Sequence, residues 1–205
     1  MQAQTSSGDM RVRFFHELVQ PYQSLISRSV RNDLVASKVS DIAAASNALA
    51  VSAAHFLEVG KLPAGDAEEE QLRQMLQDVA DSAKHGALGD PKRTIKLEAS
   101  LGYEIDDEKG SRFLKTEVWA SSDRFGSFDL INTVGKYIET LNGRLQFEIT
   151  QLKPTIEPGP FNNEAVAKVT KNTVDVASFG IRTYKRDASG SLNLADPGKF
   201  TIVVV

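Results

Sequence analysis

The chain of 205 residues contains no cysteine. This absence excludes disulfide bonds, thiolate zinc sites, iron–sulfur clusters and cysteine nucleophiles. Long hydrophobic runs are also missing, because the apolar run at 202–205 is far shorter than the roughly 20 residues of a membrane-spanning helix. The polar start, Met1–Asp9, lacks the basic, apolar and small-residue order of a signal peptide. We therefore expect a cytoplasmic protein, without a membrane segment, whose residues 1–9 are flexible.

The sequence has no strong excess of charge of either sign. It carries 24 basic and 27 acidic residues, a formal net charge of −3, and the charges are divided evenly along the chain. Affinity for nucleic acid depends mainly on a basic surface that neutralises phosphates. We therefore expect protein partners or further copies of this chain rather than nucleic acid.

The first part of the chain, residues 10–86, has apolar residues at helical spacing. A first helix is expected from Arg11 onward, with a break near Gln20 caused by Pro21. A helix with Asp66 as its N-terminal cap has an acidic first turn and ends before Gly86, a typical C-terminal cap. Between them lies the clearest helix, whose buried seam is predicted to contain Val35, Val39, Ile42, Ser46, Leu49, Ala53 and Phe56.

The second part, residues 94–205, alternates apolar and polar residues, which is typical of strands. Residues 95–106 and 112–120 predict an antiparallel hairpin around the turn 107–110. A helix is expected at 128–141 with Ser127 as its N-terminal cap, and a third strand is expected to carry Leu145, Phe147 and Ile149. A final pair of strands is expected at 173–185 and 200–205. The pattern predicts a single α+β domain over 10–205, in which an N-terminal helical layer packs on a mainly antiparallel C-terminal sheet with one inserted helix.

Few residues suggest catalysis. The sequence has no nucleotide-binding glycine loop, no Gly-x-Ser-x-Gly elbow and no His-Glu-x-x-His motif. If the first two helices turn near Arg31, His85 would stand at the same end of the bundle, and the two could act on a phosphodiester as cation and general acid or base. His16, His55, Glu17 and Glu58 could approach one another, but the paired Glu-x-x-His motif of di-iron bundles is absent. We therefore expect no metal and no cofactor.

One cluster of aromatic residues and arginine suggests a contact with a partner. Trp119, Arg124, Phe125 and Phe128 surround a predicted turn, and such residues often anchor protein interfaces. The preferred hypothesis is a non-enzymatic assembly subunit, adaptor or regulator that acts through protein contacts at these four residues. The alternatives are a ribonuclease-like enzyme using Arg31 and His85, and a module that binds a small ligand between the helices and the sheet.

Overall fold

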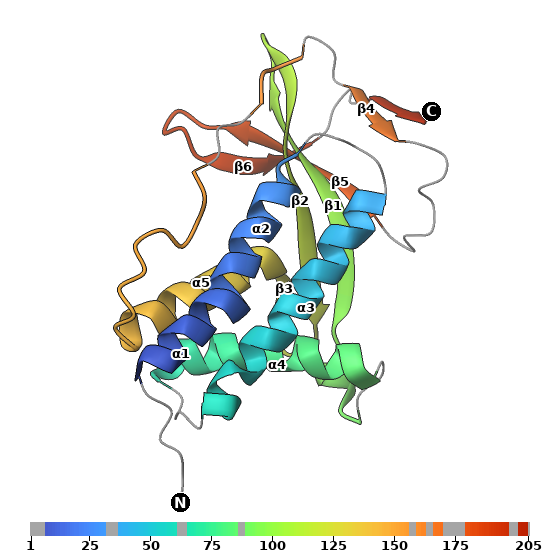
Figure 1. Cartoon of the computed structure of the whole chain (residues 1–205). Coiled ribbons are helices and arrows are strands. Elements are labelled where there is room, and N and C mark those ends of the chain that lie inside the picture. The colour runs from blue at the N-terminus through green and yellow to red at the C-terminus, as the bar shows by residue number, and fades with distance from the viewer. Residues whose placement is uncertain are drawn as a thin grey trace, which may run out of the picture.

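The protein is an α+β fold in which N-terminal helices pack on one face of a C-terminal sheet (Figure 1). The computed structural model describes residues 7–31, 37–60, 65–85, 89–155, 159–162, 166–169, 179–196 and 201–204. The predicted order of a helical part followed by a mainly antiparallel sheet with one inserted helix is confirmed. None of the described helices is long and apolar enough to cross a membrane.

The first helical segment passes Pro21 without the predicted break. It consists of α1 (Ser7–Phe14), the π-helical turn η1 (Phe15–Val19) and α2 (Gln20–Ser29). The N–H of Gln20 bonds to the carbonyl of Phe15, five residues earlier. Because proline has no N–H and its ring crowds the preceding turn, a wider π turn accommodates Pro21 at the start of α2. The sequence shows the proline but does not predict the π turn that precedes it.

The next two helices confirm most of the predicted helical pattern. All members of the predicted seam of α3 (Ser37–Gly60) from Val39 onward are buried, and Val35 lies outside the described residues. At the start of α4 (Ala67–His85), the Asp66 carboxylate accepts a hydrogen bond from the Glu69 N–H at 2.9 Å. Asp66 is therefore the N-terminal cap that the sequence predicts. The predicted cap Gly86 lies outside the described residues.

The main sheet has five strands in the order β3-β2-β1-β5-β6. The predicted hairpin is present as β1 (Lys96–Asp106) and β2 (Gly110–Ser122), which follow the short helix η2 (Pro91–Arg93). β3 (Gly126–Asp129) extends β2 on one side. On the other side β5 (Phe179–Arg186) joins β1 in parallel, and β6 (Leu192–Ala195) is the antiparallel edge strand.

Two predictions for the C-terminal strands are wrong. The partner of β5 across the turn is β6, whereas β7 (Thr201–Val204) pairs in parallel with β4 (Val166–Val169) in a separate two-stranded sheet. The predicted strand at 145–149 is also absent, because Gln146 and Glu148 have positive φ angles of 52° and 55° that interrupt an extended backbone. The apolar residues there still pack inward, and Phe147 lies 4.9 Å from Phe14 between ring centroids.

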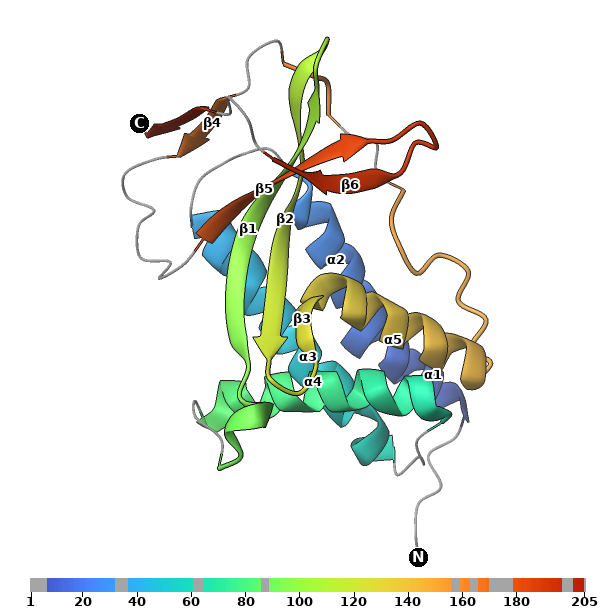
Figure 2. The same cartoon turned by 180° about the vertical axis from the view of Figure 1, so that it is seen from behind.

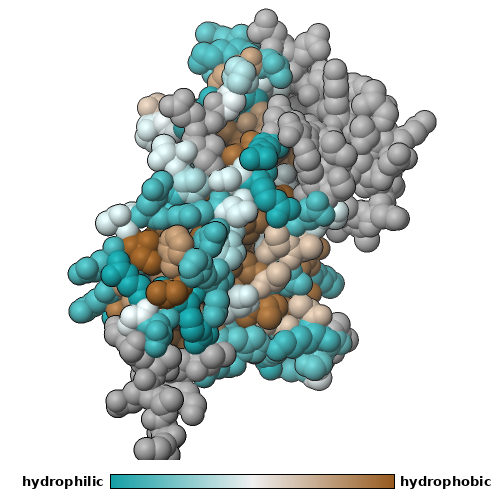
Figure 3. All heavy atoms as spheres, in the orientation of Figure 1, coloured by the Kyte–Doolittle hydropathy of each residue, from teal (hydrophilic) through white to brown (hydrophobic). Residues whose placement is uncertain are grey.

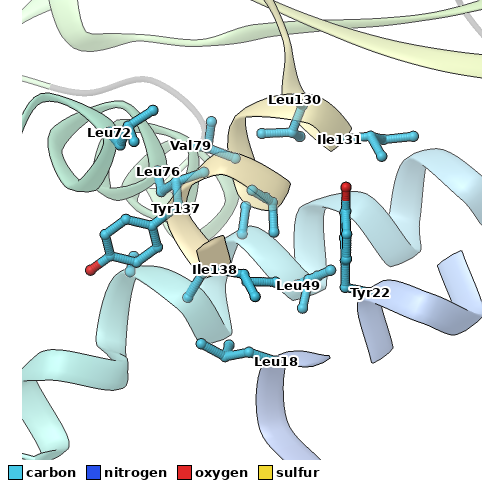
Figure 4. Packing of buried hydrophobic residues seen from close by; sticks show 14 of the residues in the cluster. Leu18, Tyr22, Leu49, Leu72, Leu76, Val79, Leu130, Ile131, Tyr137 and Ile138 are labelled. Atoms are coloured by element: carbon cyan, nitrogen blue, oxygen red, sulfur yellow. The ribbon is translucent and has the colours of Figure 1, made fainter. Parts of the chain in front are cut away.

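The inserted helix α5 (Leu130–Arg144) begins two residues later than predicted. Its N-terminal cap is Asp129, whose carboxylate accepts a hydrogen bond from the Asn132 N–H, and not Ser127. Phe128 belongs to β3 instead. Side chains from η1, α2, α3, α4 and α5 meet in one apolar cluster, with Leu49 of α3 in its interior (Figure 4).

Gly135 of α5 permits the close approach of α2. A Cβ atom at this position would overlap the hydroxyl oxygen of Tyr22 and would lie 2.7 Å from its Cζ.

We expect Gly135→Ala to lower the free energy of unfolding by about 1 to 3 kcal/mol through overpacking, even though alanine has a higher helix propensity than glycine. Chemical denaturation measures this change. The buried Tyr22 hydroxyl has no hydrogen-bond partner in the described part of the chain, so Tyr22→Phe should restore part of the loss. A stabilising effect of Gly135→Ala would contradict this packing.

Candidate functional site

The face of the sheet that points away from the helices carries a compact set of charged and aromatic side chains. Figure 2 shows β1, β2, β5 and β6 from this side, with α2 and α3 behind them. The alternation of side chains along each strand places polar residues here and apolar residues such as Ala99, Val118 and Ala120 on the helix side. We call this set the outer face, and it comprises Ser100, Gly102, Glu104, Arg112, Lys115, Glu117, Trp119, Arg182, Tyr184 and Arg186.

Glu117 is a buried carboxylate at the centre of the outer face. It accepts hydrogen bonds from the Trp119 indole N–H at 3.0 Å and from the Tyr184 hydroxyl at 2.9 Å. The Lys115 Nζ lies 3.7 Å away and also bonds to Asp129. Burial and the nearby negative charge of Glu117 raise the pKa of Tyr184 far above its usual value, so the hydroxyl remains a donor at neutral pH.

Two arginines hold a second buried carboxylate, Glu104. Arg112 Nη2 lies 2.6 Å from one carboxylate oxygen, and Arg186 Nε lies 2.8 Å from the other. Glu104, Arg112 and Arg186 come from β1, β2 and β5, so the cluster joins three strands. Together with the bond from Tyr184 to Glu117, it fixes β5 on the sheet and thereby positions the β5–β6 hairpin.

The turn between β5 and β6 is closed by side-chain hydrogen bonds to Asp187. Its carboxylate accepts bonds from Ser189 Oγ at 2.6 Å, the Ser191 N–H at 3.0 Å and Asn193 Nδ2 at 2.9 Å. These bonds lower the pKa of Asp187 to about 2. Gly190 takes the positive φ of 85° that the turn requires. The hairpin is therefore well defined up to its end.

The last strand of the sheet, β6, exposes two leucines. Leu192 and Leu194 are 39% and 65% exposed and point to the outer face, opposite Arg186 and Tyr184 of β5. The Asp187 N–H bonds to the Ser191 carbonyl, and hydrogen-bonded and non-bonded pairs alternate in an antiparallel ladder. Asn193 and Ala195 are therefore the residues whose backbone bonds to β5. The backbone N–H and C=O groups of Leu192 and Leu194 point away from β5, to an edge that no other strand of the described residues covers; we call it the open edge.

A groove of about 560 Å³ lies between α1, η1 and the segment after α5. Val12 and Phe15 on its wall are exposed, and hydrophobic side chains lie among hydrophilic ones on this side of the molecule (Figure 3). The π turn and the left-handed residue Glu148 also border the groove. The small-ligand hypothesis places its ligand elsewhere, between helices and sheet, where apolar side chains fill the space.

The structure does not bring Arg31 and His85 together. The neighbour of His85, Lys84, lies 2.7 Å from the ring of His55 in the last third of α3. Arg31 precedes the first residue of α3, Ser37. A helix rises about 1.5 Å per residue, so His55 is about 27 Å from the start of α3. Both Arg31 and His85 are exposed. The structure therefore does not form the pair of residues on which the ribonuclease-like alternative depends.

The other histidines are paired with residues of their own surroundings. His16 Nδ1 bonds to Gln20 Oε1 at 3.0 Å, and His55 Nδ1 lies 2.7 Å from Glu58 Oε2. Within the described ranges, no group of three or more histidine, aspartate or glutamate side chains is arranged to hold a metal ion.

The four predicted partner-binding residues do not form one surface. Trp119 lies on the outer face, half-buried, with the Arg182 guanidinium 4.1 Å above its ring. Phe128 pairs with Ala120, so it points to the helix side and is buried in the core, and Phe125 packs against the same core. Arg124 bonds to Gln74 and Asp78 of α4. The prediction lacked the register of β2 and β3, which places Trp119 and Phe128 on opposite faces.

Leu192 and Leu194 could not be identified as site residues from the sequence. Their signal is short, an alternation of leucine with small or polar residues after the Asp187–Gly190 turn. Comparison of the chain with protein-family models, curated proteins and solved structures gives no match.

Proposed function

We propose that this protein acts through contacts with other protein chains, and that β6 is the edge to which another strand is added. The observation that supports the proposal most strongly is the combination of an open backbone edge with two exposed leucines at alternate positions. In strand addition, main-chain hydrogen bonds supply affinity and alternate side chains supply specificity. Leu192 and Leu194 would provide both.

The composition of β6 supports this proposal. Edge strands that must stay unpaired are commonly protected by charged residues, proline or a bulge. The sequence of β6, Leu-Asn-Leu-Ala, contains neither charge nor proline, and its pairing with β5 shows no register shift. The opposite edge, β3, is also short, but the chain turns directly from it into α5. The two edges of the sheet therefore differ in what they offer a partner.

The outer face supports the proposal by holding β6 in place. Added strands bind more tightly to an edge that needs no ordering, because the entropic cost of binding is lower. The ion pairs of Glu104 and the Asp187 turn hold the two strands of the hairpin. The open edge is therefore preorganised.

The variant Leu194→Lys tests this function. A charge at this position should oppose the addition of an apolar strand, as lysine does on natural edges. Native mass spectrometry of the particle isolated from its own cells should show a mass above the 22.4 kDa of one chain, and Leu194→Lys should return it to that mass. Val12→Lys is the matched control, because Val12 is similarly exposed, at 57%, but lies on α1. A wild-type particle of one chain, or a particle that Leu194→Lys leaves unchanged, would contradict the proposal.

A further inference from the structure

We infer that the strand added to β6 is β6 of a second copy, so that two sheets join into one around a two-fold axis at Asn193. This inference rests on the proposed function, because it names the partner of the same edge. A two-fold contact requires a surface that is complementary to itself. The short sequence of β6 meets this requirement in both backbone and side chains.

One register pairs the outward backbone groups of both leucines of β6 with those of a second copy. The outward N–H and C=O groups belong to Leu192 and Leu194, which flank Asn193. In an antiparallel pair, residues with outward groups must stand opposite each other to exchange hydrogen bonds. With Asn193 opposite Asn193 of the second copy, Leu192 faces Leu194 of that copy, and both pairs exchange both bonds.

The side chains agree with this register. Directly opposed residues of an antiparallel pair lie on the same face of the sheet. Leu192 and Leu194 both point to the outer face, so each leucine would pack against a leucine of the second copy and lose exposed apolar area. No like charges would be opposed, because Asn193 is the only polar side chain of the strand. Asn193 points to the other face, where it bonds to Asp187.

Disulfide trapping in the cysteine-free chain tests this register directly. In this register Asn193 stands opposite Asn193 of the second copy as a non-hydrogen-bonded pair. The Cα atoms of such a pair lie about 4.5 Å apart, within the range that a disulfide spans. Purified Asn193→Cys should therefore form a covalent dimer under mild oxidation. Leu192→Cys alone should crosslink much less, because Leu192 faces position 194, whereas a mixture of Leu192→Cys with Leu194→Cys should form the mixed dimer. Asn193→Ser is the control for the cysteine variant, because it also lacks the side-chain amide but cannot form a disulfide. Its sedimentation shows whether loss of this side-chain amide alone prevents dimerisation.

The outcomes separate this inference from the proposed function. Rapid crosslinking of Asn193→Cys together with the mixed 192–194 dimer would support the two-fold register. A wild-type chain that sediments as a monomer, or a dimer that Asn193→Cys does not crosslink, would overturn it. If the native particle still loses another chain in Leu194→Lys, the edge binds a different protein and the proposed function stands. If Leu194→Lys changes no assembly at all, both proposals fail.

Discussion

Leu49→Ala is expected to lower the free energy of unfolding by about 2 to 5 kcal/mol, because it leaves a cavity in a closely packed core. Leu49 is 4% exposed and lies in the apolar cluster that joins α3 to α2, α4 and α5 (Figure 4). The neighbouring seam residue Ala53 is fully buried, so Ala53→Leu should cost about 1 to 3 kcal/mol through overpacking. Urea denaturation of both variants measures these losses.

The two substitutions change the side-chain volume in opposite directions, which makes them a matched pair. An exposed interface helix would tolerate both, and the variants would then change only the oligomeric state. If the free energy of unfolding stays unchanged in both, α3 is not the central core helix described above.

Asp78→Ala is expected to have the second large effect, a loss of about 2 to 5 kcal/mol. The Asp78 side chain is 1% exposed and bonds to Arg93 Nε at 2.7 Å, and Arg124 Nη1 lies 3.4 Å from its other oxygen. Arg93 belongs to η2 and Arg124 to the turn before β3. The carboxylate therefore links α4 to the start of the sheet and to one of its turns, and its removal should weaken the attachment of the two parts.

Asp81→Ala is the control for this prediction. Asp81 bonds to the same Arg93, also at 2.7 Å, but its side chain is 23% exposed. Partly solvated ion pairs contribute less than about 1 kcal/mol, so this variant should stay close to the wild type. Unfolding should be followed both by helix circular dichroism and by fluorescence of the single tryptophan, Trp119, which lies in the sheet. Equal losses for the two variants would show that burial does not govern the contribution of Asp78.

The same unfolding curves test whether the chain behaves as one domain. The helices and the sheet share a core, and Asp78 joins them by ion pairs. We therefore expect the helix signal and the tryptophan signal to have the same midpoint. Separate midpoints would indicate two domains.

Helices and the first hairpin could be predicted from sequence because their apolar periods extend over many residues. The seam of α3 repeats across most of its length, and β1 alternates over eleven residues. β6 has only four residues, too few for a period, and the sequence wrongly favours the more apolar run at 200–205 as the partner of β5. A short edge strand is identified by the strand with which it pairs, and a single sequence does not show this pairing.

The candidate site was missed for a related reason. Trp119 and Phe128 are close in sequence and both aromatic, but strand register places them on opposite faces. Register depends on tertiary pairing, as does the choice of a π turn before Pro21. The sequence therefore supports the hypothesis of a protein-binding protein without locating the surface that we propose.

The most direct test of strand addition at β6 is the exchange of its backbone amides, measured by NMR at a concentration where the assembly forms. The Asn193 amide bonds to β5 and should be protected in every state, so it is an internal control. The account predicts that the amides of Leu192 and Leu194 are also protected, and that the Leu192 amide loses protection in Leu194→Lys. Exchange of the Leu192 and Leu194 amides at the rate of an unstructured peptide in the assembled particle, with its partner chain present, while Asn193 stays protected, would show that no strand is added at this edge.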